Sequence, residues 1–297
     1  MSIAHDLSQS LAGLVEQAAP YTVRVEGRRR LPATGIVYRA DGLVVTANHV
    51  VERDDNLKIG FADGSSRDAT LVGRDPGTDL ALLRVNAGDL VAAQWAAPDD
   101  LRVGHLVLAL GRPGRTVQAT LGIISAVGGS WRSPGGAEIE QYVQTDVAMY
   151  PGFSGGPLLA ADGRLAGLNS SALVQGISVA LPATTITRVV EALAAHGRVP
   201  RGYLGVGIQL VRLTDAIRRK ISQETGLMVM SVESGSPAEG GGLLQGDILV
   251  TFNDAPIRHV DELQAQLAAA PIGKSSLLRV VRGGDLRELT VAIGQAR

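Results

Sequence analysis

A serine flanked by glycines is the strongest chemical signal in this sequence. Ser154 lies within the segment GFSGGP, residues 152–157. Glycine tolerates backbone angles that other residues avoid, so such a segment can form a tight turn that exposes the hydroxyl. The same turn can direct successive backbone N–H groups into one cavity, as an oxyanion hole requires. The segment therefore predicts a nucleophile beside an oxyanion hole.

A serine hydroxyl needs a neighbouring base at neutral pH, and the sequence offers one. His49 follows the apolar run LVVTA, which would hold its backbone rigidly, and Asp79 begins the apolar run LALLRV. A carboxylate there can orient an imidazole and stabilise its protonated form. His, Asp, Ser is one of the known chain orders of such a triad. Alone, each residue fits a commoner structural role (a structural histidine, a strand cap, a Gly-rich turn), so the triad prediction rests on their joint occurrence.

The elements that must position these residues are short and rich in Val, Leu and Ile. From Tyr21 to residue 181 such runs recur at regular spacing, separated by Gly, Asp, Pro or Asn, as is typical of an all-β barrel or sandwich. Apolar residues at helical spacing predict helices over residues 6–19 and from about Pro182 to Gly197. The segment HGRVPRG is then typical of a linker, and a second module of strands and two helices follows it.

Length and composition exclude several classes of protein. A chain of 297 residues predicts about two domains, and 45% hydrophobic residues exclude wholesale disorder. A net charge of -1 argues against a nucleic-acid binder, and the lack of cysteine excludes disulfides and thiolate nucleophiles. No apolar stretch is long enough for a transmembrane segment. The first residues lack the pattern of a signal peptide, so the sequence as it stands predicts a cytoplasmic protein, or a periplasmic or cell-envelope protein if a leader was removed.

Several segments together resemble the trypsin-like serine proteases of the high-temperature-requirement (Deg) family. The protease-like segments are DGLVVTANHVV (41–51), DPGTDLALLRV (75–85), VGHLVLALG (103–111), LGIISAV (121–127), QTDVAMYPGFSGGPL (144–158) and GISVALP (176–182). The second module resembles the PDZ domain of the same family through RGYLGV (201–206), SGSPA (234–238) and LQGDIL (244–249). The resemblance covers almost the whole chain from about Tyr21.

The resemblance implies a mainly β protein. We expect an N-terminal helical segment (1–20), a trypsin-like double six-stranded β-barrel domain (21–197), a linker (198–202) and a C-terminal α+β PDZ domain (203–297). It also implies the catalytic roles: His49 is the general base and then the acid, Asp79 orients it, and Ser154 attacks the scissile carbonyl. The N–H groups of Gly152 and Ser154 would form the oxyanion hole. No cofactor or metal is implied, and the sequence shows no metal-ligand spacing of its own.

Three positions depart from the patterns of the family and its digestive relatives. The residue before the serine, usually Asn in the family, is Phe153, and we hypothesise that burial of its ring sets the Gly152 peptide and biases the resting oxyanion hole. The usual Gly-Ser-Gly before the histidine strand is replaced by residues 33–35, ATG. Ala148 and Met149 stand where digestive relatives carry an acidic residue, which predicts an apolar specificity pocket and cleavage after small or medium aliphatic residues.

In the second module, Tyr203, Leu204, Gly205 and Val206 match the family's carboxylate-binding loop. PDZ domains add a peptide as a strand and hold its C-terminal carboxylate in backbone N–H groups. Ile208, Leu263 and Leu267 would line the apolar pocket with Val206, although ordinary core positions would look the same. The family commonly forms trimers through N-terminal segments, so the resemblance leaves a homotrimer open, with the N-terminal helix and Tyr21 as the candidate contacts.

Taken together, these features predict an ATP-independent bacterial serine endopeptidase of protein quality control and stress response. Its partners would be unfolded protein substrates and, at the PDZ domain, peptide C-termini. One alternative is a catalytically dormant scaffold or chaperone-like peptide-binding protein on a protease fold, which Phe153 keeps open. Another is a latent protease that is activated when a peptide engages the PDZ domain.

Overall fold

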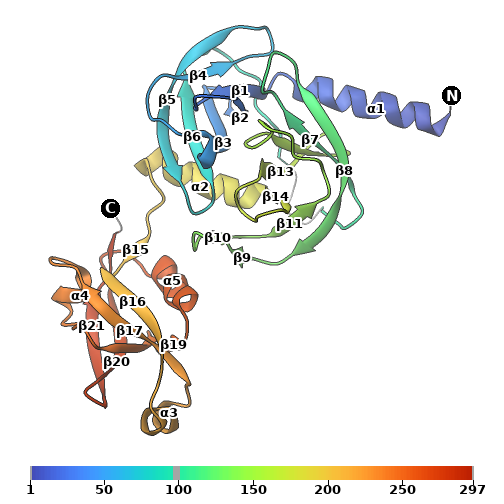
Figure 1. The fold of residues 1–297 in the computed structure, drawn as a ribbon. Helices are drawn as coiled ribbons and strands as arrows, with labels where there is room; N and C mark the ends of the chain where they lie inside the picture. The colour runs from blue at the N-terminus through green and yellow to red at the C-terminus, as the bar shows by residue number, and fades with distance from the viewer. Residues whose placement is uncertain (1, 96–100, 296–297) are drawn as a thin grey trace. The chain divides into compact units, whose positions relative to one another are not determined.

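The computed structural model describes residues 2–95 and 101–295 (Figure 1). The chain divides into two compact units, Met1–Val199 and Pro200–Arg297. The division falls within the predicted linker, residues 198–202. Among the described helices, none combines the length and the apolar character needed to cross a bilayer.

Two closed barrels of six strands each make up the first unit, as the sequence predicts. The first barrel runs in the order β1-β2-β3-β6-β5-β4. Its strands are β1 (Thr22–Glu26), β2 (Ala33–Arg39), β3 (Leu43–Ala47), β4 (Leu57–Gly60), β5 (Ser66–Asp75) and β6 (Leu80–Val85). The second barrel runs in the order β11-β14-β13-β12-β7-β8. Its strands are β7 (Leu106–Gly111), β8 (Gln118–Gly128), β11 (Tyr142–Thr145), β12 (Pro157–Ala160), β13 (Leu165–Ser170) and β14 (Ser178–Leu181).

The most apolar strands lie where the barrel interior needs them. Every residue of β3 is buried, and β3 pairs antiparallel with β6 so that Ala47 faces Leu80. This register brings the residues that follow β3 next to those that precede β6, which are His49 and Asp79. The valine and leucine side chains of both strands belong to one continuous core, and their burial supplies most of the driving force for closing the barrel.

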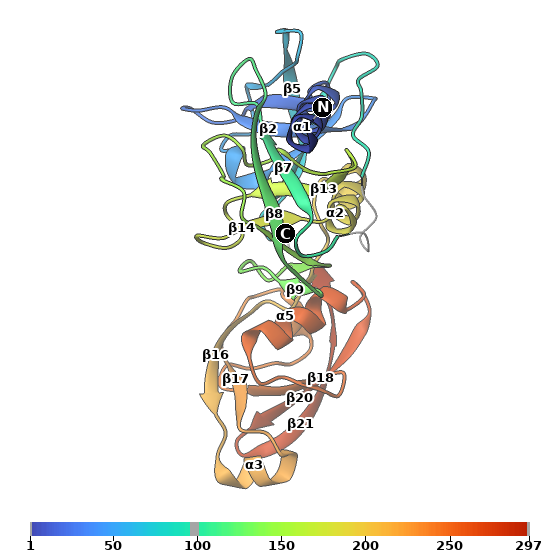
Figure 2. The same cartoon turned by 90° about the vertical axis from the view of Figure 1, so that its right-hand side faces the viewer.

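Helices and a hairpin complete the first unit. They are α1 (Ile3–Ala18), the 3₁₀ turn η1 (Asn48–Val50), α2 (Ala183–His196), β9 (Trp131–Arg132) and β10 (Glu138–Ile139). The N-terminal part of α1 extends beyond the barrels in Figure 1, and its N-terminus faces the viewer in Figure 2, whereas Leu11, Leu14 and Val15 of its second half pack against the barrel core. Its outer residue Ile3 is 89% exposed. In contrast, α2 lies against β5, β6 and β13, and its apolar face is buried there.

Tyr21 lies in the core of its own unit. Its side chain is only 7% exposed and belongs to the main apolar cluster of the barrels. A side chain buried within one protomer has little surface left for a second one. Of the two segments named above as candidate trimer contacts, only the exposed face of α1 is therefore free to make one.

The second unit is a six-stranded antiparallel sheet with three helices. Its strands follow the order β16-β17-β18-β20-β21, with β19 paired to β18, and β15 and β22 form a separate two-stranded sheet. The strands are β15 (Gly202–Tyr203), β16 (Val206–Arg212), β17 (Thr225–Val232), β18 (Ile248–Phe252), β19 (Ala255–Pro256), β20 (Ser275–Arg282), β21 (Asp285–Ala292) and β22 (Gly294–Gln295). The helices are α3 (Asp215–Ile221), α4 (Pro237–Gly240) and α5 (Val260–Ala269). A separate apolar core includes Leu227, Phe252 and Leu263.

Candidate active site

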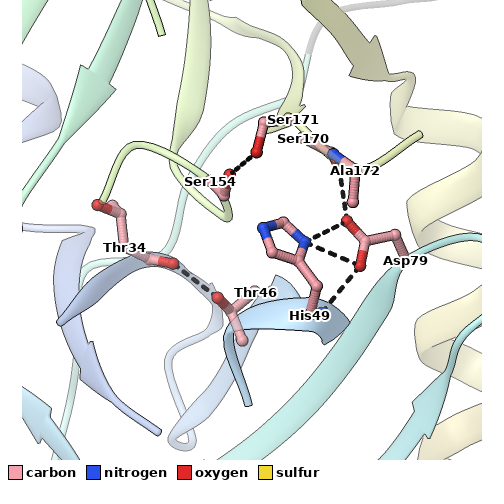
Figure 3. Close-up of polar contacts among 8 residues, drawn as sticks. All are labelled: Thr34, Thr46, His49, Asp79, Ser154, Ser170, Ser171 and Ala172. Carbon is pink, nitrogen blue, oxygen red and sulfur yellow. Dashed lines mark hydrogen bonds and ion pairs between the residues drawn. The ribbon is translucent and has the colours of Figure 1, made fainter. Parts of the chain in front are cut away.

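The ends of β3 and β6 place a histidine against a buried carboxylate. His49 lies in η1, and the Asn48 N–H donates to the Asp79 carbonyl at 2.9 Å. Asp79 is 4% exposed and has a positive φ of 56°. Its Oδ2 lies 2.8 Å from His49 Nδ1, and its Oδ1 accepts from the His49 backbone N–H at 2.9 Å (Figure 3). The carboxylate thus fixes both the backbone and the ring of His49.

This contact determines which ring nitrogen is available for chemistry. A carboxylate accepts a proton donor, so it favours the imidazole tautomer with hydrogen on Nδ1. The lone pair is then on Nε2, the nitrogen on the far side of the ring from Asp79 (Figure 3). A third donor, Ser170 Oγ at the end of β13, also binds Asp79 Oδ2 at 2.5 Å. Three hydrogen-bond donors thus converge on the Asp79 carboxylate and fix its position beside His49.

The turn before β12 exposes two backbone donors beside Ser154. Gly152 has φ +94°, and a Cβ there would lie 2.6 Å from Pro113 Cβ, so no other residue fits without strain. Within the turn, the Phe153 N–H donates to the Tyr150 carbonyl at 3.0 Å and the Gly155 N–H to the Asn169 carbonyl at 2.8 Å. The N–H groups of Gly152 and Ser154 have no acceptor among the described residues. Two unpaired donors on either side of one hydroxyl can stabilise an oxyanion.

Thr34 holds this turn in place from β2. Its Oγ1 donates to the Gly152 carbonyl at 2.6 Å and accepts from the Arg112 N–H at 2.8 Å, while its own N–H donates to the Ser154 carbonyl at 3.3 Å. Thr34 is fully buried. The departure at residues 33–35 is visible in the sequence, but the sequence alone does not predict this role for Thr34. With its carbonyl held, the Gly152 peptide keeps a fixed orientation.

The nucleophile is hydrogen-bonded to a serine outside the triad. Ser154 Oγ lies 3.0 Å from Ser171 Oγ, and among the described residues it makes no hydrogen bond to His49 (Figure 3). Ser154 is 7% exposed, whereas Ser171 is exposed. Ser170 and Ser171 were both missed by sequence reasoning. The only signal they give is a run of polar residues, NSS, at the end of a buried strand.

Phe153 occupies the apolar niche that its position requires. The ring is fully buried in the core of the second barrel and meets Tyr150 edge to face, with ring centroids 5.7 Å apart. A Cβ at Gly111 would lie 2.4 Å from the ring. The ring is thus confined on the side of β7 as well. Its effect on the oxyanion hole stays a hypothesis.

The two predicted specificity residues lie just before the turn. Ala148 is exposed, and its carbonyl accepts from Thr120 Oγ1 at 2.9 Å. Met149 is half-buried against the core that contains Phe153. Neither side chain carries charge, and both lie in the segment that joins β11 to the Ser154 turn. The aliphatic specificity stays a prediction.

Comparison with known proteins identifies the family. Residues 33–168 match the trypsin-like peptidase domain family and residues 202–293 match the PDZ domain family. The structure of the HtrA-type protease AlgW with a decapeptide aligns with a TM-score of 0.76 at 30% identity, covering 96% of this chain and 98% of that one. This chain belongs to the HtrA-type proteases. The predicted family, the mainly β fold and the C-terminal PDZ domain are thereby confirmed.

Two further relatives match this chain at similar identity. The serine endoprotease from Yersinia pestis aligns with a TM-score of 0.76 at 29% identity, covering 96% of this chain and 98% of that one. A probable periplasmic serine endoprotease, DegP-like, from Pseudomonas fulva is 38% identical over 267 residues, which are 88% of this chain and 55% of the relative. The HtrA-type chain thus spans about half the length of the curated relatives it matches.

The PDZ domain presents two backbone donors at the predicted loop. The carbonyls of Leu204 and Gly205 accept from Ala238 and Glu233, each at 2.9 Å. The N–H groups of Leu204 and Gly205 have no acceptor among the described residues. Gly205 has φ +83°, and a Cβ there would lie 2.3 Å from Ser236 Cβ. Consecutive unpaired N–H groups fit a carboxylate.

Side chains around this loop are mainly apolar. Val206, Ile208 and Leu267 are partly buried against the PDZ core, and Leu263 is 2% exposed. Leu263 is therefore a core residue, and the three others have surface left for a ligand. Tyr203 donates its hydroxyl to the Glu233 carboxylate. In the described parts of the chain, no group of three His, Asp or Glu side chains is placed to hold a metal ion.

Proposed function

We propose that this HtrA-type chain is an ATP-independent serine endopeptidase that cleaves misfolded or unfolded proteins after small or medium aliphatic residues. The observation that carries the proposal is the pair formed by His49 Nδ1 and Asp79 Oδ2 at 2.8 Å, next to two unpaired N–H groups around Ser154. A base of fixed tautomer and a preformed anion site are the two parts that acyl transfer needs.

The reaction follows from these positions. Ser154 turns its hydroxyl from Ser171 to His49 Nε2, which takes the proton as Oγ bonds to the scissile carbonyl carbon. The carbonyl oxygen becomes an oxyanion held by the N–H groups of Gly152 and Ser154. When the intermediate collapses, the C–N bond breaks and the imidazolium gives its proton to the leaving amine. Water then attacks the acyl-enzyme by the same route, and Asp79 keeps its negative charge throughout.

We assign substrate recruitment or gating to the PDZ domain. Support comes from the unpaired N–H groups of Leu204 and Gly205 and from the solved structures of the HtrA-type protease AlgW with a decapeptide and with a tripeptide. We place the protein in the periplasm because the curated relatives are named periplasmic. A homotrimer built through the exposed face of α1 is part of the proposal.

A dormant or latent form is the second candidate. The observation that favours it is the bond between Ser154 Oγ and Ser171 Oγ at 3.0 Å in place of one to His49. In a latent protease the hydroxyl would turn only when a peptide engages. In a scaffold it would never do so.

Hydrolysis of reduced casein separates these candidates. We would compare the parent with Ser154→Ala, each with and without an apolar C-terminal peptide. Cleavage by the parent that Ser154→Ala abolishes is the expected result. A rate that rises only with the peptide would point to latency, and no cleavage under any condition would favour the scaffold.

A further inference from the structure

A small polar cavity lies where the two barrels approach each other, outside the catalytic residues. Its volume is about 120 Å³. Arg24 of β1, the end of β4 and the β4–β5 turn line one side, and Gly114 and Arg115 of the β7–β8 loop line the other. Both charged residues in this lining are arginines. None of the lining residues is a carboxylate.

Arg24 has a buried N–H group without an acceptor. Its Nη2 donates to Glu26 Oε1 at 2.5 Å, but its Nε is buried and has no hydrogen-bond partner among the described residues. The Arg24 guanidinium packs closely on Gly60 of β4. A Cβ at Gly60 would lie only 3.0 Å from Nε and 3.1 Å from Cζ. A buried donor on a charged group is costly when unpaired. In a native protein it marks a place for a bound water or ion.

A third arginine adds positive charge behind the cavity. The Arg112 side chain donates to the carbonyls of Thr22, Arg115 and Ala19. These three hydrogen bonds hold its guanidinium, and hence its positive charge, in place. Burial, together with the nearby charge of Arg24, lowers the pKa of Arg112. Burial is the larger cause of this lower pKa, and repulsion from the Arg24 charge adds to it. An anion bound by Arg24 would offset the repulsion between Arg24 and Arg112.

The other charged groups around the cavity leave the balance positive. Arg67 stacks on Phe61, with Cζ 5.9 Å from the ring centroid. The carboxylate of Glu26 accepts a hydrogen bond from Arg24. Asp63 Oδ1 accepts from the N–H and the hydroxyl of Ser65 at 2.8 and 2.7 Å. Both carboxylates thus have donors of their own.

We propose that this cavity binds one phosphate-sized oxyanion between Arg24 and Arg115. Guanidinium groups pair with phosphate oxygens in bidentate geometry, and such charge-assisted bonds are about twice as strong as neutral ones. The volume has room for several water molecules, and therefore for a single tetrahedral anion or the end of a phosphomonoester.

The anion would act on the oxyanion hole through the β7–β8 loop. This loop, residues 112–117, contains both Arg115 and Pro113. Arg115 lines the cavity, and Pro113 packs against Gly152. The Arg112 N–H, in the same loop, donates to Thr34 Oγ1, which holds the Gly152 carbonyl. An anion that fixes Arg115 restrains this loop and hence the Gly152 peptide. This second step rests on the proposed peptidase function, whereas the binding step does not.

Binding is tested on the full chain carrying Ser154→Ala, which cannot cleave itself. We expect inorganic phosphate to raise the Tm by about 2–4 °C at concentrations well above its Kd, relative to chloride at equal ionic strength. Phosphate also stabilises proteins nonspecifically, so the variants decide. Arg115→Gln, at an exposed position that the fold does not need, and Arg24→Gln should lose the shift. Arg84→Gln, on the outer face of β6, should keep it. An equal shift in all four proteins overturns the site.

Two further measurements complete the test. Glycerol 3-phosphate in place of phosphate shows whether a phosphomonoester enters the cavity. A rise in Tm that Arg115→Gln removes extends the site to monoesters. If glycerol 3-phosphate does not raise the Tm, the site is restricted to the free ion. In the protein with Ser154 intact, phosphate should raise the rate of Ser154 labelling by a fluorophosphonate at least twofold, and Arg115→Gln should remove the rise. A phosphate-dependent Tm with an unchanged labelling rate overturns the coupling to Gly152.

Discussion

Ser154 Oγ and Ser171 Oγ lie 3.0 Å apart and share a hydrogen bond. The bond joins the turn before β12 to the segment after β13, and it engages Ser154 Oγ with Ser171 and not with His49 (Figure 3). A neutral hydrogen bond of this kind is worth about 0.5–1.5 kcal/mol. Before it can attack, the nucleophile must break this bond, and part of the activation barrier is therefore set by a residue outside the triad.

Ser171→Ala should therefore speed acylation. Converting the hydrogen-bond energy at about 1.36 kcal/mol per tenfold gives an increase of roughly 2- to 10-fold in the labelling rate by a fluorophosphonate. Ser171→Thr keeps a hydroxyl and should retain the parent rate. Because Ser171 is exposed, Ser171→Ala should lower the Tm by at most the few degrees that one lost hydrogen bond costs, and Ser171→Thr should keep it. A slower reaction in Ser171→Ala, restored in Ser171→Thr, would show instead that the Ser171 hydroxyl assists the attack.

Thr34→Val should lower kcat with little change in KM. Valine has the shape of threonine but leaves the Gly152 carbonyl without its donor at 2.6 Å, so the oxyanion-hole peptide loses its anchor. Loss of a whole oxyanion donor costs about 10²–10³ in kcat, and loss of its support should cost about tenfold. Thr34→Ser keeps the hydroxyl and serves as the control. Steady-state kinetics on a peptide would count against this role if valine and serine gave the same kcat.

Local patterns in the sequence were enough to place His49 and Ser154 on their elements. An apolar run of strand length ends next to His49, and only a turn accommodates the glycines around Ser154. Ser170 and Thr34 could not be assigned in this way, because their partners Asp79 and Gly152 lie 91 and 118 positions away. Such contacts depend on how the barrel strands pair and how the barrels close, which no local period encodes.

Phe153→Asn tests whether the buried ring sets the oxyanion hole. Asparagine would place an amide in an apolar core and leave a cavity where the ring meets Tyr150, so we expect a lower kcat and a loss of about 3 kcal/mol in stability. Phe153→Leu keeps the site apolar and separates the two effects. The hypothesis fails if kcat of Phe153→Asn matches the parent under conditions where the variant is folded.

Peptide binding to the PDZ domain should depend on a free C-terminal carboxylate. Amidation removes the charge that the N–H groups of Leu204 and Gly205 would hold, and charge-assisted hydrogen bonds are worth about 1.5–3 kcal/mol. Affinity for an apolar peptide should fall at least tenfold on amidation, as measured by calorimetry. Gly205→Ala should weaken the free acid too, because its Cβ would lie 2.3 Å from Ser236. Equal affinity for acid and amide would refute carboxylate recognition.

Stability at alkaline pH should depend on Tyr21. Burial raises the pKa of the Tyr21 hydroxyl to about 12 from its ordinary value of 10.0. The unfolded chain ionises first as the pH rises, so the contribution of the buried phenol is complete below pH 10 and is lost between pH 10 and 12. Urea unfolding of the Ser154→Ala protein at pH 8 and 11.5 should therefore show about 2 kcal/mol more loss with Tyr21 than with Tyr21→Phe. The exposed Tyr150 supplies the control, and Tyr150→Phe should behave like the parent. If Tyr21→Phe lost as much stability as the parent over this range, the phenol would not be buried as the structure shows, and Tyr21 would again be a candidate contact between chains.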